Sequence, residues 1–222
     1  MLRPNIIILA GILISSSCPS FAQVKEPGID SVKQTIIVLR KHGFFEKYST
    51  LSNDQVFDTL HQQRIAEFSK MFERYYDPGM ELETFQILML DRKKVVYGDG
   101  EAGVGKGNNA YVSLLQAFSA ASGGLFNPKN IIEKWETGEG PIQVSFINQD
   151  EKIMFEPDYT NDWLSEKVFE VINQQMIKNG KEKFYLFLEK DGLGLGQYFL
   201  YIRMTELQKK GLEKTFGWKF SD

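Results

Sequence analysis

The sequence predicts an α+β protein in which N-terminal helices are followed by a mainly antiparallel sheet with interspersed helices. Three observations support this prediction. After residue 30, apolar residues first recur at helical spacing. Beyond residue 130, short runs alternate between apolar and polar residues, as in strands that bury one face. The order of helices first, then strands mixed with helices, is typical of the α+β class.

The first two predicted elements are helices. One covers residues 30–42, and the second begins at Ser52 and continues to Tyr75. Ser52 and Gln55 have the spacing of a capping box, in which a hydroxyl and an amide satisfy free backbone N–H groups. Residues 77–79, Asp-Pro-Gly, supply the turn chemistry that follows this helix.

The middle of the chain is less clear. Within residues 83–97, the run 85–90 fits either a helix or a strand, whereas 94–97 fits a strand. A glycine-rich loop over residues 98–107 follows. A helix is predicted next, over residues 109–122.

The rest of the chain is predicted to alternate between strands and helices. Five strands are expected, over residues 131–135, 142–147, 152–156, 184–188 and 198–202, with the second and third as a hairpin. Thr160 or Asn161 can cap the helix that precedes the fourth strand. Thr205 and Gln208 form a second capping box, and the last helix ends before Gly217.

The first 22 residues have the pattern of a secretory signal peptide. Arg3 gives a positive start, residues 6–14 an apolar core, and Ser20-Phe21-Ala22 a small-x-small cleavage site. The apolar run is too short to cross a bilayer as a helix, which needs about 20 residues. We therefore expect an exported protein, periplasmic or secreted, that is not an integral membrane protein after cleavage. Lipid attachment through Cys18 is the weaker alternative, because a leucine-like residue is missing three positions before it.

The residues that remain after cleavage, 23–222, are predicted to form a single α+β domain, with a helical subdomain over 23–80 as the alternative division. Cys18 is the only cysteine, so the cleaved chain is expected to depend on packing without disulfides. The formal net charge of −3 at pH 7, with lysines and glutamates mixed in the C-terminal third, argues against nucleic-acid binding.

The glycine-rich loop matches part of a phosphate-binding loop, because two of its glycines and Lys106 have the required spacing. Gly107, however, stands where the hydroxyl that binds magnesium is needed, and Asp99 and Glu101 would repel a polyanion. We therefore predict that the protein binds no nucleotide. The acidic residues of this loop also lack the spacing of a calcium-binding loop.

No catalytic set is recognisable in the sequence. His42 and His61 have no histidine or carboxylate at metal-ligand spacing, so no metal site and no cofactor is expected. No Gly-x-Ser-x-Gly nucleophile motif occurs. Carboxylate pairs for glycoside cleavage are defined by distance in space, so Glu133, Glu136 and Glu139 near Trp135 leave that chemistry open. The more ordinary interpretation is that Glu133 and Glu139 are surface residues and that Trp135 belongs to the core.

Eight residues are the candidate binding residues, because they place charges or aromatic rings in the glycine-rich loop, beside Glu133 or at a turn: Asp99, Glu101, Lys106, Trp135, Asp158, Tyr159, Asp162 and Trp163. Exposed aromatic residues on an exported protein indicate a binding surface. The more ordinary role of residues 158–163 is helix capping. Convergence of residues 98–107, Trp135 and residues 158–163 would indicate a true site.

These features favour a non-enzymatic binding module of the cell envelope, whose partner is a protein or a polysaccharide. A carboxylate-based hydrolase that acts on extracellular or envelope glycans is one alternative. An inhibitor or immunity-like protein that neutralises an incoming enzyme is the other.

Overall fold

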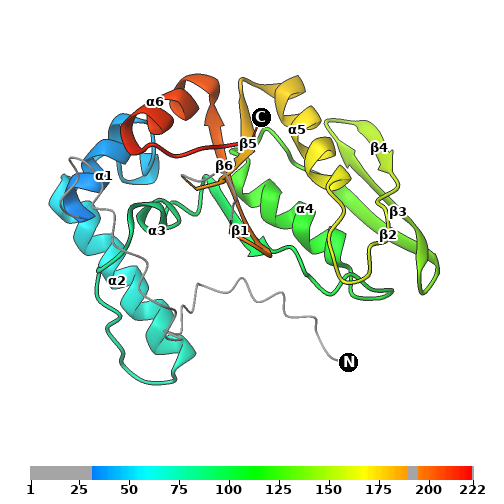
Figure 1. Cartoon of the computed structure of the whole chain (residues 1–222), viewed down its shortest axis with the longest axis horizontal. Helices are drawn as coiled ribbons and strands as arrows, with labels where there is room; N and C mark the ends of the chain where they lie inside the picture. Colours follow the sequence, from blue (N-terminus) through cyan, green and yellow to red (C-terminus); the bar gives the residue numbers. More distant parts are fainter. Residues whose placement is uncertain (1–31, 190–194, 222) are drawn as a thin grey trace. The chain divides into compact units, whose positions relative to one another are not determined.

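The computed structural model describes residues 32–189 and 195–221, which belong to two compact units (Figure 1). Residues 32–91 form a helical unit, and the described residues from Arg92 onward form an α+β unit. The predicted signal peptide over residues 1–22, with its cleavage site and Cys18, lies outside the described residues. How many domains fold independently stays a prediction.

The helical unit contains three α-helices and one 3-10 turn. Helix α1 covers Val32–Lys41, the turn η1 covers Glu46–Tyr48, α2 covers Asn53–Met71 and α3 covers Thr84–Leu88. Apolar side chains from all three α-helices are almost fully buried: Ile36, Leu39, Val56, Leu60, Ile87 and Leu88. The Asp91 carboxylate accepts a hydrogen bond from the backbone N–H of Phe45 at 2.6 Å, which fixes the end of this unit to the turn after α1.

The start of α2 confirms the sequence prediction, but its end does not. Ser52 and Gln55 form the predicted capping box. The helix ends at Met71 rather than at Tyr75, and Glu73 adopts a left-handed backbone with φ of 53°. The chain turns back there because the backbone N–H of Tyr76 donates to the Ser69 hydroxyl at 2.8 Å.

The ambiguous run over residues 85–90 is helical as far as Leu88, as part of α3. Its start is fixed by Glu83 and Gln86, which form a capping box that the sequence prediction missed. The strand predicted over residues 94–97 is observed as β1, Val95–Asp99, so it includes the first two residues of the predicted glycine-rich loop.

The α+β unit contains two antiparallel three-stranded sheets. One has the order β1-β6-β5, with β6 over Tyr198–Thr205 and β5 over Glu182–Leu186. The other has the order β2-β3-β4, with β2 over Lys129–Thr137, β3 over Gly140–Asn148 and β4 over Glu151–Phe155. The predicted α+β class, with N-terminal helices before antiparallel strands, is therefore confirmed, and the strands divide between two sheets.

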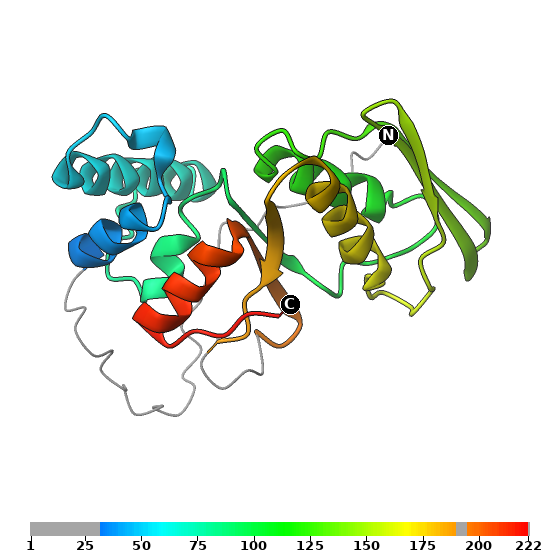
Figure 2. The same cartoon turned by 90° about the horizontal axis from the view of Figure 1, so that it is seen from above.

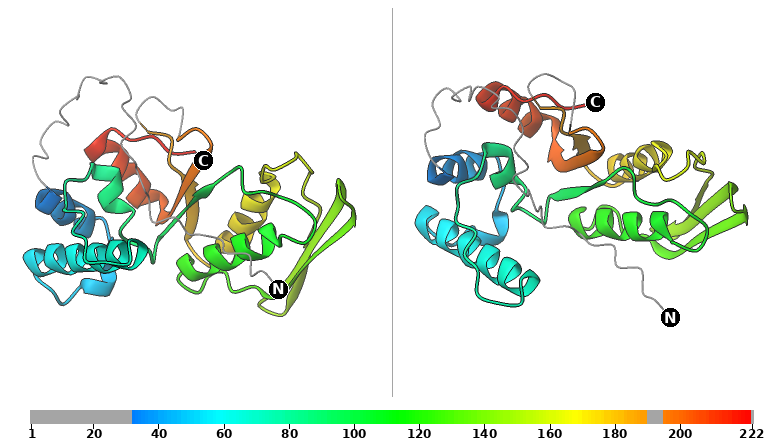
Figure 3. Two further views of the ribbon diagram at one scale, coloured as in Figure 1. Left: turned by 90° about the horizontal axis from the view of Figure 1, so that it is seen from below. Right: turned by 60° about the horizontal axis from the view of Figure 1, so that its bottom comes forward.

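Two helices lie between these sheets and supply the core of the α+β unit (Figures 2 and 3). Helix α4, Ala110–Ala121, and helix α5, Lys167–Asn179, each contact a strand of both sheets. Phe118 of α4 is fully buried, and its ring lies 4.7 Å from the ring of Phe184 and 5.4 Å from that of Tyr201. The third helix, α6 over Glu206–Phe216, follows β6 directly through the predicted Thr205 capping box and ends at Gly217 as predicted.

The β3–β4 hairpin is confirmed, and its turn explains its register. Gln149 and Asp150 both have positive φ, 47° and 65°, as required by the two-residue turn that suits the twist of antiparallel strands.

The predicted start of α5 is wrong, because the helix begins at Lys167 and not after Thr160 or Asn161. The Thr160 hydroxyl donates to the carbonyl of Trp163 at 3.1 Å, so it stabilises a local turn and does not cap a helix.

Candidate functional site

The glycine-rich loop and the segment 158–163 lie side by side in the α+β unit. Glu101 and Trp163 form an antiparallel bridge. Leu164 donates its backbone N–H to the carbonyl of Gly100 at 2.9 Å, and Val104 donates to the carbonyl of Asp162 at 3.2 Å. We call residues 99–106 together with 158–163 the loop junction. Two segments that are about 60 positions apart in the sequence therefore form one surface.

The turn at the start of the loop is held by the end of β1. Asp99 accepts a hydrogen bond from the backbone N–H of Glu101 at 2.9 Å and another from the side-chain amide of Gln197 at 3.1 Å. Gly100 lies close to the backbone of Gln197 and to the ring of Trp163. A Cβ added to Gly100 would be 2.9 Å from the carbonyl oxygen of Gln197 and 3.4 Å from the Trp163 ring. The Trp163 ring thus packs against backbone at a position where a side chain would not fit.

Trp135 adjoins the loop junction from strand β2. Its ring lies 5.6 Å from that of Tyr159 in an edge-on arrangement. The Lys106 ammonium donates to the carbonyl of Glu136, the next residue of the strand, at 3.3 Å. The three regions whose convergence would indicate a site therefore adjoin one another, because strand β2 contacts one segment of the junction through Trp135 and the other through the carbonyl of Glu136.

Glu133 fixes the orientation of Trp135 and the start of α4. One carboxylate oxygen of Glu133 accepts from the indole N–H of Trp135 at 2.8 Å, and the other accepts from the backbone N–H of Tyr111 at 3.0 Å. A carboxylate at the N-terminus of a helix satisfies a free N–H group and interacts favourably with the helix dipole. Glu133 therefore takes up one of the N–H groups that the N-terminus of α4 could otherwise offer to an anion.

A shallow, open depression of about 420 Å³ lies at the edge of the loop junction. It is lined by residues from the junction, from the segment 164–166 that follows it and from the first turn of α5: Asp158, Thr160, Leu164, Ser165, Glu166, Lys167 and Glu170. Asp158 forms an ion pair with Lys167 at 2.8 Å, which leaves Glu166 and Glu170 as the further carboxylates of this hollow. The hollow is thus acidic and open to solvent.

A buried tyrosine, Tyr111, and a partly buried one, Tyr201, lie close to this region. Burial raises the pKa of Tyr111, whose hydroxyl accepts from the backbone N–H of Ser165 at 3.1 Å. Burial also raises the pKa of Tyr201 well above its ordinary value, and the negative charge of Glu166 adds to this effect. Both hydroxyls therefore stay protonated at neutral pH and act as structural groups.

The structure brings the eight predicted residues into one region, although only Asp158 of them lines the hollow. Sequence analysis missed Glu166 and Glu170, which line the hollow from the N-cap position and the first turn of α5. It also treated Glu133 as a surface residue. Neither histidine lies here, since His42 and His61 belong to the helical unit, where His61 Nε2 is 2.7 Å from an Asp77 carboxylate oxygen.

Within residues 32–189 and 195–221, no group of three or more His, Cys, Asp or Glu side chains is placed to hold a metal ion. In the same part of the chain, no helix is both long and apolar enough to span a membrane. Comparison with protein-family models, with curated proteins and with solved structures finds no match to this chain. The assignment of a function therefore depends on the geometry of the loop junction.

Proposed function

We propose that the protein is an exported binding module whose loop junction binds another protein through a basic surface of that partner. The observation that carries this proposal is the bridge between Glu101 and Trp163, because it places an exposed indole ring among carboxylates. A binding surface of this kind needs no deep pocket, which agrees with the open form of the hollow beside it.

The charge of the region favours a basic partner. Residues 99–106 and 156–170 contain seven carboxylates against two lysines: Asp99, Glu101, Glu156, Asp158, Asp162, Glu166 and Glu170 against Lys106 and Lys167. Lys167 is already paired with Asp158, and Lys106 donates to a backbone carbonyl. A complementary charge on the partner would steer the encounter and would make it sensitive to salt.

The aromatic residues supply the apolar contact that a charged surface lacks. The Trp163 side chain is 44% exposed although its ring packs on Gly100, so one part of the indole is fixed and another part is free. Tryptophan is among the residue types that most often carry binding energy at protein interfaces. A fixed ring loses little conformational entropy when a partner covers it.

A glycan ligand is the second candidate, because aromatic rings beside carboxylates also suit sugars. The inhibitor hypothesis is a special case of the main proposal, in which the basic partner is an enzyme. A hydrolase would need two carboxyl groups roughly 5–9.5 Å apart on opposite sides of a glycosidic bond. The experiment below separates these alternatives.

The test places a photo-crosslinking amino acid with an aromatic side chain, which keeps a ring for the apolar contact, at position 163 in one variant and at position 207 in a matched control. Leu207 is an exposed residue of α6, so both variants present the probe to solvent. We expect position 163 alone to crosslink one protein of an envelope extract, with a yield that falls when salt is added. Binding of that purified protein should weaken about tenfold or more in Trp163→Ala.

Four outcomes would contradict the proposal. Equal crosslinking at positions 163 and 207 would show that contact is nonspecific, and no crosslinking at position 163 would remove the protein partner. Crosslinking of labelled polysaccharide without protein would favour the glycan alternative, and release of reducing ends by the unmodified protein would favour the hydrolase.

A further inference from the structure

A second surface, in the helical unit, carries an inference that is independent of the loop junction. We define the tip of α2 as residues 70–77, the end of the helix and the turn that follows it (Figure 1). Four of the ten large apolar or aromatic side chains that are exposed in the described residues belong to it. They are Met71 at 37%, Phe72 at 44%, Tyr75 at 76% and Tyr76 at 40%.

In the part of the chain that the structure describes, the second half of α2 contributes no fully buried side chain. The buried residues of this 19-residue helix are Val56 and Leu60, both in its first half. From His61 onward, every residue of α2 keeps part of its surface exposed, including the apolar residues Ile65 and Phe68. An apolar patch that a soluble protein leaves uncovered in this way usually marks an interaction surface.

The tip is nevertheless a fixed structure. Arg74 donates its backbone N–H to the carbonyl of Ser69 at 3.1 Å, and the rings of Phe72 and Tyr76 are 4.8 Å apart. The turn is closed by the contact between His61 and Asp77 at 2.7 Å. A preformed aromatic surface binds without a large ordering cost, so its exposure favours a role in binding.

The exposed area limits the kind of partner. If a fully exposed side chain of this size offers 150–250 Å², the four exposed fractions amount to roughly 400 Å². A standard interface buries about 800 Å² per partner, so the tip with its rim can support a weak, reversible contact.

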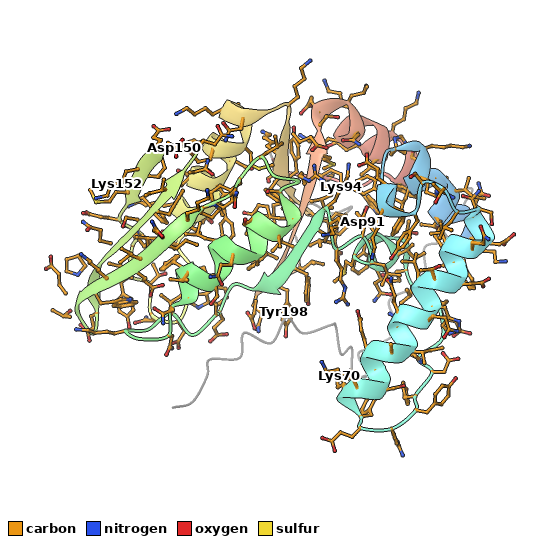
Figure 4. The ribbon with its side chains drawn as sticks, turned by 180° about the vertical axis from the view of Figure 1, so that it is seen from behind. Lys70, Asp91, Lys94, Asp150, Lys152 and Tyr198 are labelled. Carbon is orange, nitrogen blue, oxygen red and sulfur yellow. The ribbon has the colours of Figure 1, made fainter. Side chains whose placement is uncertain are left out.

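The charges at the tip are self-complementary. Lys70, labelled in Figure 4, and Arg74 are cations, Glu73 lies between them, and all three are exposed. Among the described residues, none of these three has an ion-pair partner within 4.0 Å. If a two-fold axis passes beside Glu73 and not through it, a second copy of the same surface places its cations next to Glu73 of the first copy, and its own Glu73 next to the cations of the first copy.

We propose that the tip of α2 is a homodimer interface, in which residues 70–77 of one copy pack against residues 70–77 of a second copy. An anionic membrane fits these observations less well, because Glu73 and Asp77 would approach it as carboxylates. A different partner protein would need both a carboxylate opposite the cations of the tip and a cation opposite Glu73. A second copy has this mixture of charges already.

Sedimentation velocity on the purified protein over a range of concentrations tests this proposal. We expect a reversible monomer–dimer equilibrium with dimer at concentrations above roughly 10 μM. Tyr75→Ala should raise the dissociation constant about 30-fold, the size of effect expected for an interface hot spot. Tyr75 is the most exposed of the four side chains, so its removal should leave the melting temperature unchanged.

Charge reversal separates this interface from any other. Glu73→Lys alone and Arg74→Glu alone should each weaken the dimer, whereas a mixture of the two variants should form a heterodimer. Leu207→Ala is the matched control at an exposed apolar residue outside the tip, and it should leave the dissociation constant unchanged.

A monomer at all concentrations up to about 1 mM would overturn the proposal. So would a dimer that Tyr75→Ala leaves intact, or mixed charge variants that associate no better than each alone. Partition onto vesicles of anionic lipid by a protein that stays monomeric would assign the tip to a membrane surface instead.

Discussion

The Glu133 carboxylate accepts a hydrogen bond from the backbone N–H of Tyr111 at 3.0 Å, so a residue of β2 caps helix α4. The same carboxylate accepts from the indole of Trp135, and the Tyr111 hydroxyl accepts from Ser165. A single chain of hydrogen bonds thus connects the β2-β3-β4 sheet, α4 and the start of α5. The loop junction lies over this framework.

Glu133→Ala should therefore destabilise the α+β unit by about 1 kcal/mol, because the first turn of α4 loses its acceptor. Glu133→Gln should cost less, since the amide keeps an acceptor oxygen but lacks the charge. Urea denaturation measures both changes, and Glu139→Ala is the control, because Glu139 is an exposed residue of the β2–β3 turn. Equal stability of Glu133→Ala and Glu139→Ala would show that the cap contributes nothing.

Local signals in the sequence predicted most of the helices and strands. The capping boxes at Ser52 and Thr205 are confirmed, because the participating side chains lie within three residues of each other. The division into two sheets could not be predicted, since strand pairing depends on contacts between distant residues. The end of α2 was also predicted wrongly. Phe72 and Tyr75 continue the helical spacing of apolar residues, but both are exposed and no core packing keeps them in the helix.

The sequence predicted which types of residue belong to the candidate site, but it did not predict the contacts between them. Aspartates beside Tyr159 and Trp163 indicated a surface, but the bridge from Trp163 to Glu101 depends on the fold. Thr160 has the chemistry of a helix cap, and the structure uses its hydroxyl for the carbonyl of Trp163. The capping role of Glu133 was missed, because a carboxylate that caps a helix from a distant strand leaves no sequence signature.

Gly98→Ala should destabilise the α+β unit by roughly 1–3 kcal/mol, through overpacking of the core. An added Cβ would lie 2.4 Å from the ring of Phe199, which is buried in the core and packs against Phe169 of α5. Gly138→Ala is the matched control, because a Cβ there would meet nothing within 4 Å. Urea denaturation measures the free energy of unfolding of both variants. Similar unfolding midpoints for the two would contradict the contact between residue 98 and the Phe199 ring.

Asp77 should make the tip of α2 sensitive to acid. The backbone N–H of Gly79 holds the pKa of this carboxyl below its ordinary value of 3.8, and His61 adds to the effect. A group whose pKa is lower in the folded state stabilises the fold above its ordinary pKa. That contribution is lost as the pH falls through the folded value.

The stability difference between the unmodified protein and Asp77→Asn should therefore be present at about pH 6 and should shrink below the ordinary aspartate range. Thermal unfolding followed by the helical circular dichroism signal measures this difference at each pH. A difference that stays constant from about pH 6 to pH 3 would mean that the Asp77 charge has no role.

Tyr201 should lower the stability of the fold at alkaline pH, whereas Asp77 lowers it at acid pH. Burial raises the pKa of its hydroxyl above the ordinary value of 10.0, so the folded state favours the protonated form. Stability from this effect is complete below the ordinary pKa and decreases as the pH rises toward the folded value. Tyr201→Phe removes the ionisable group, so its free energy of unfolding should fall less steeply above about pH 10. Tyr198→Phe, at an exposed ring of the same strand, is the control. Parallel alkaline unfolding curves for the two variants would place the Tyr201 hydroxyl in solvent and would contradict its burial close to the loop junction.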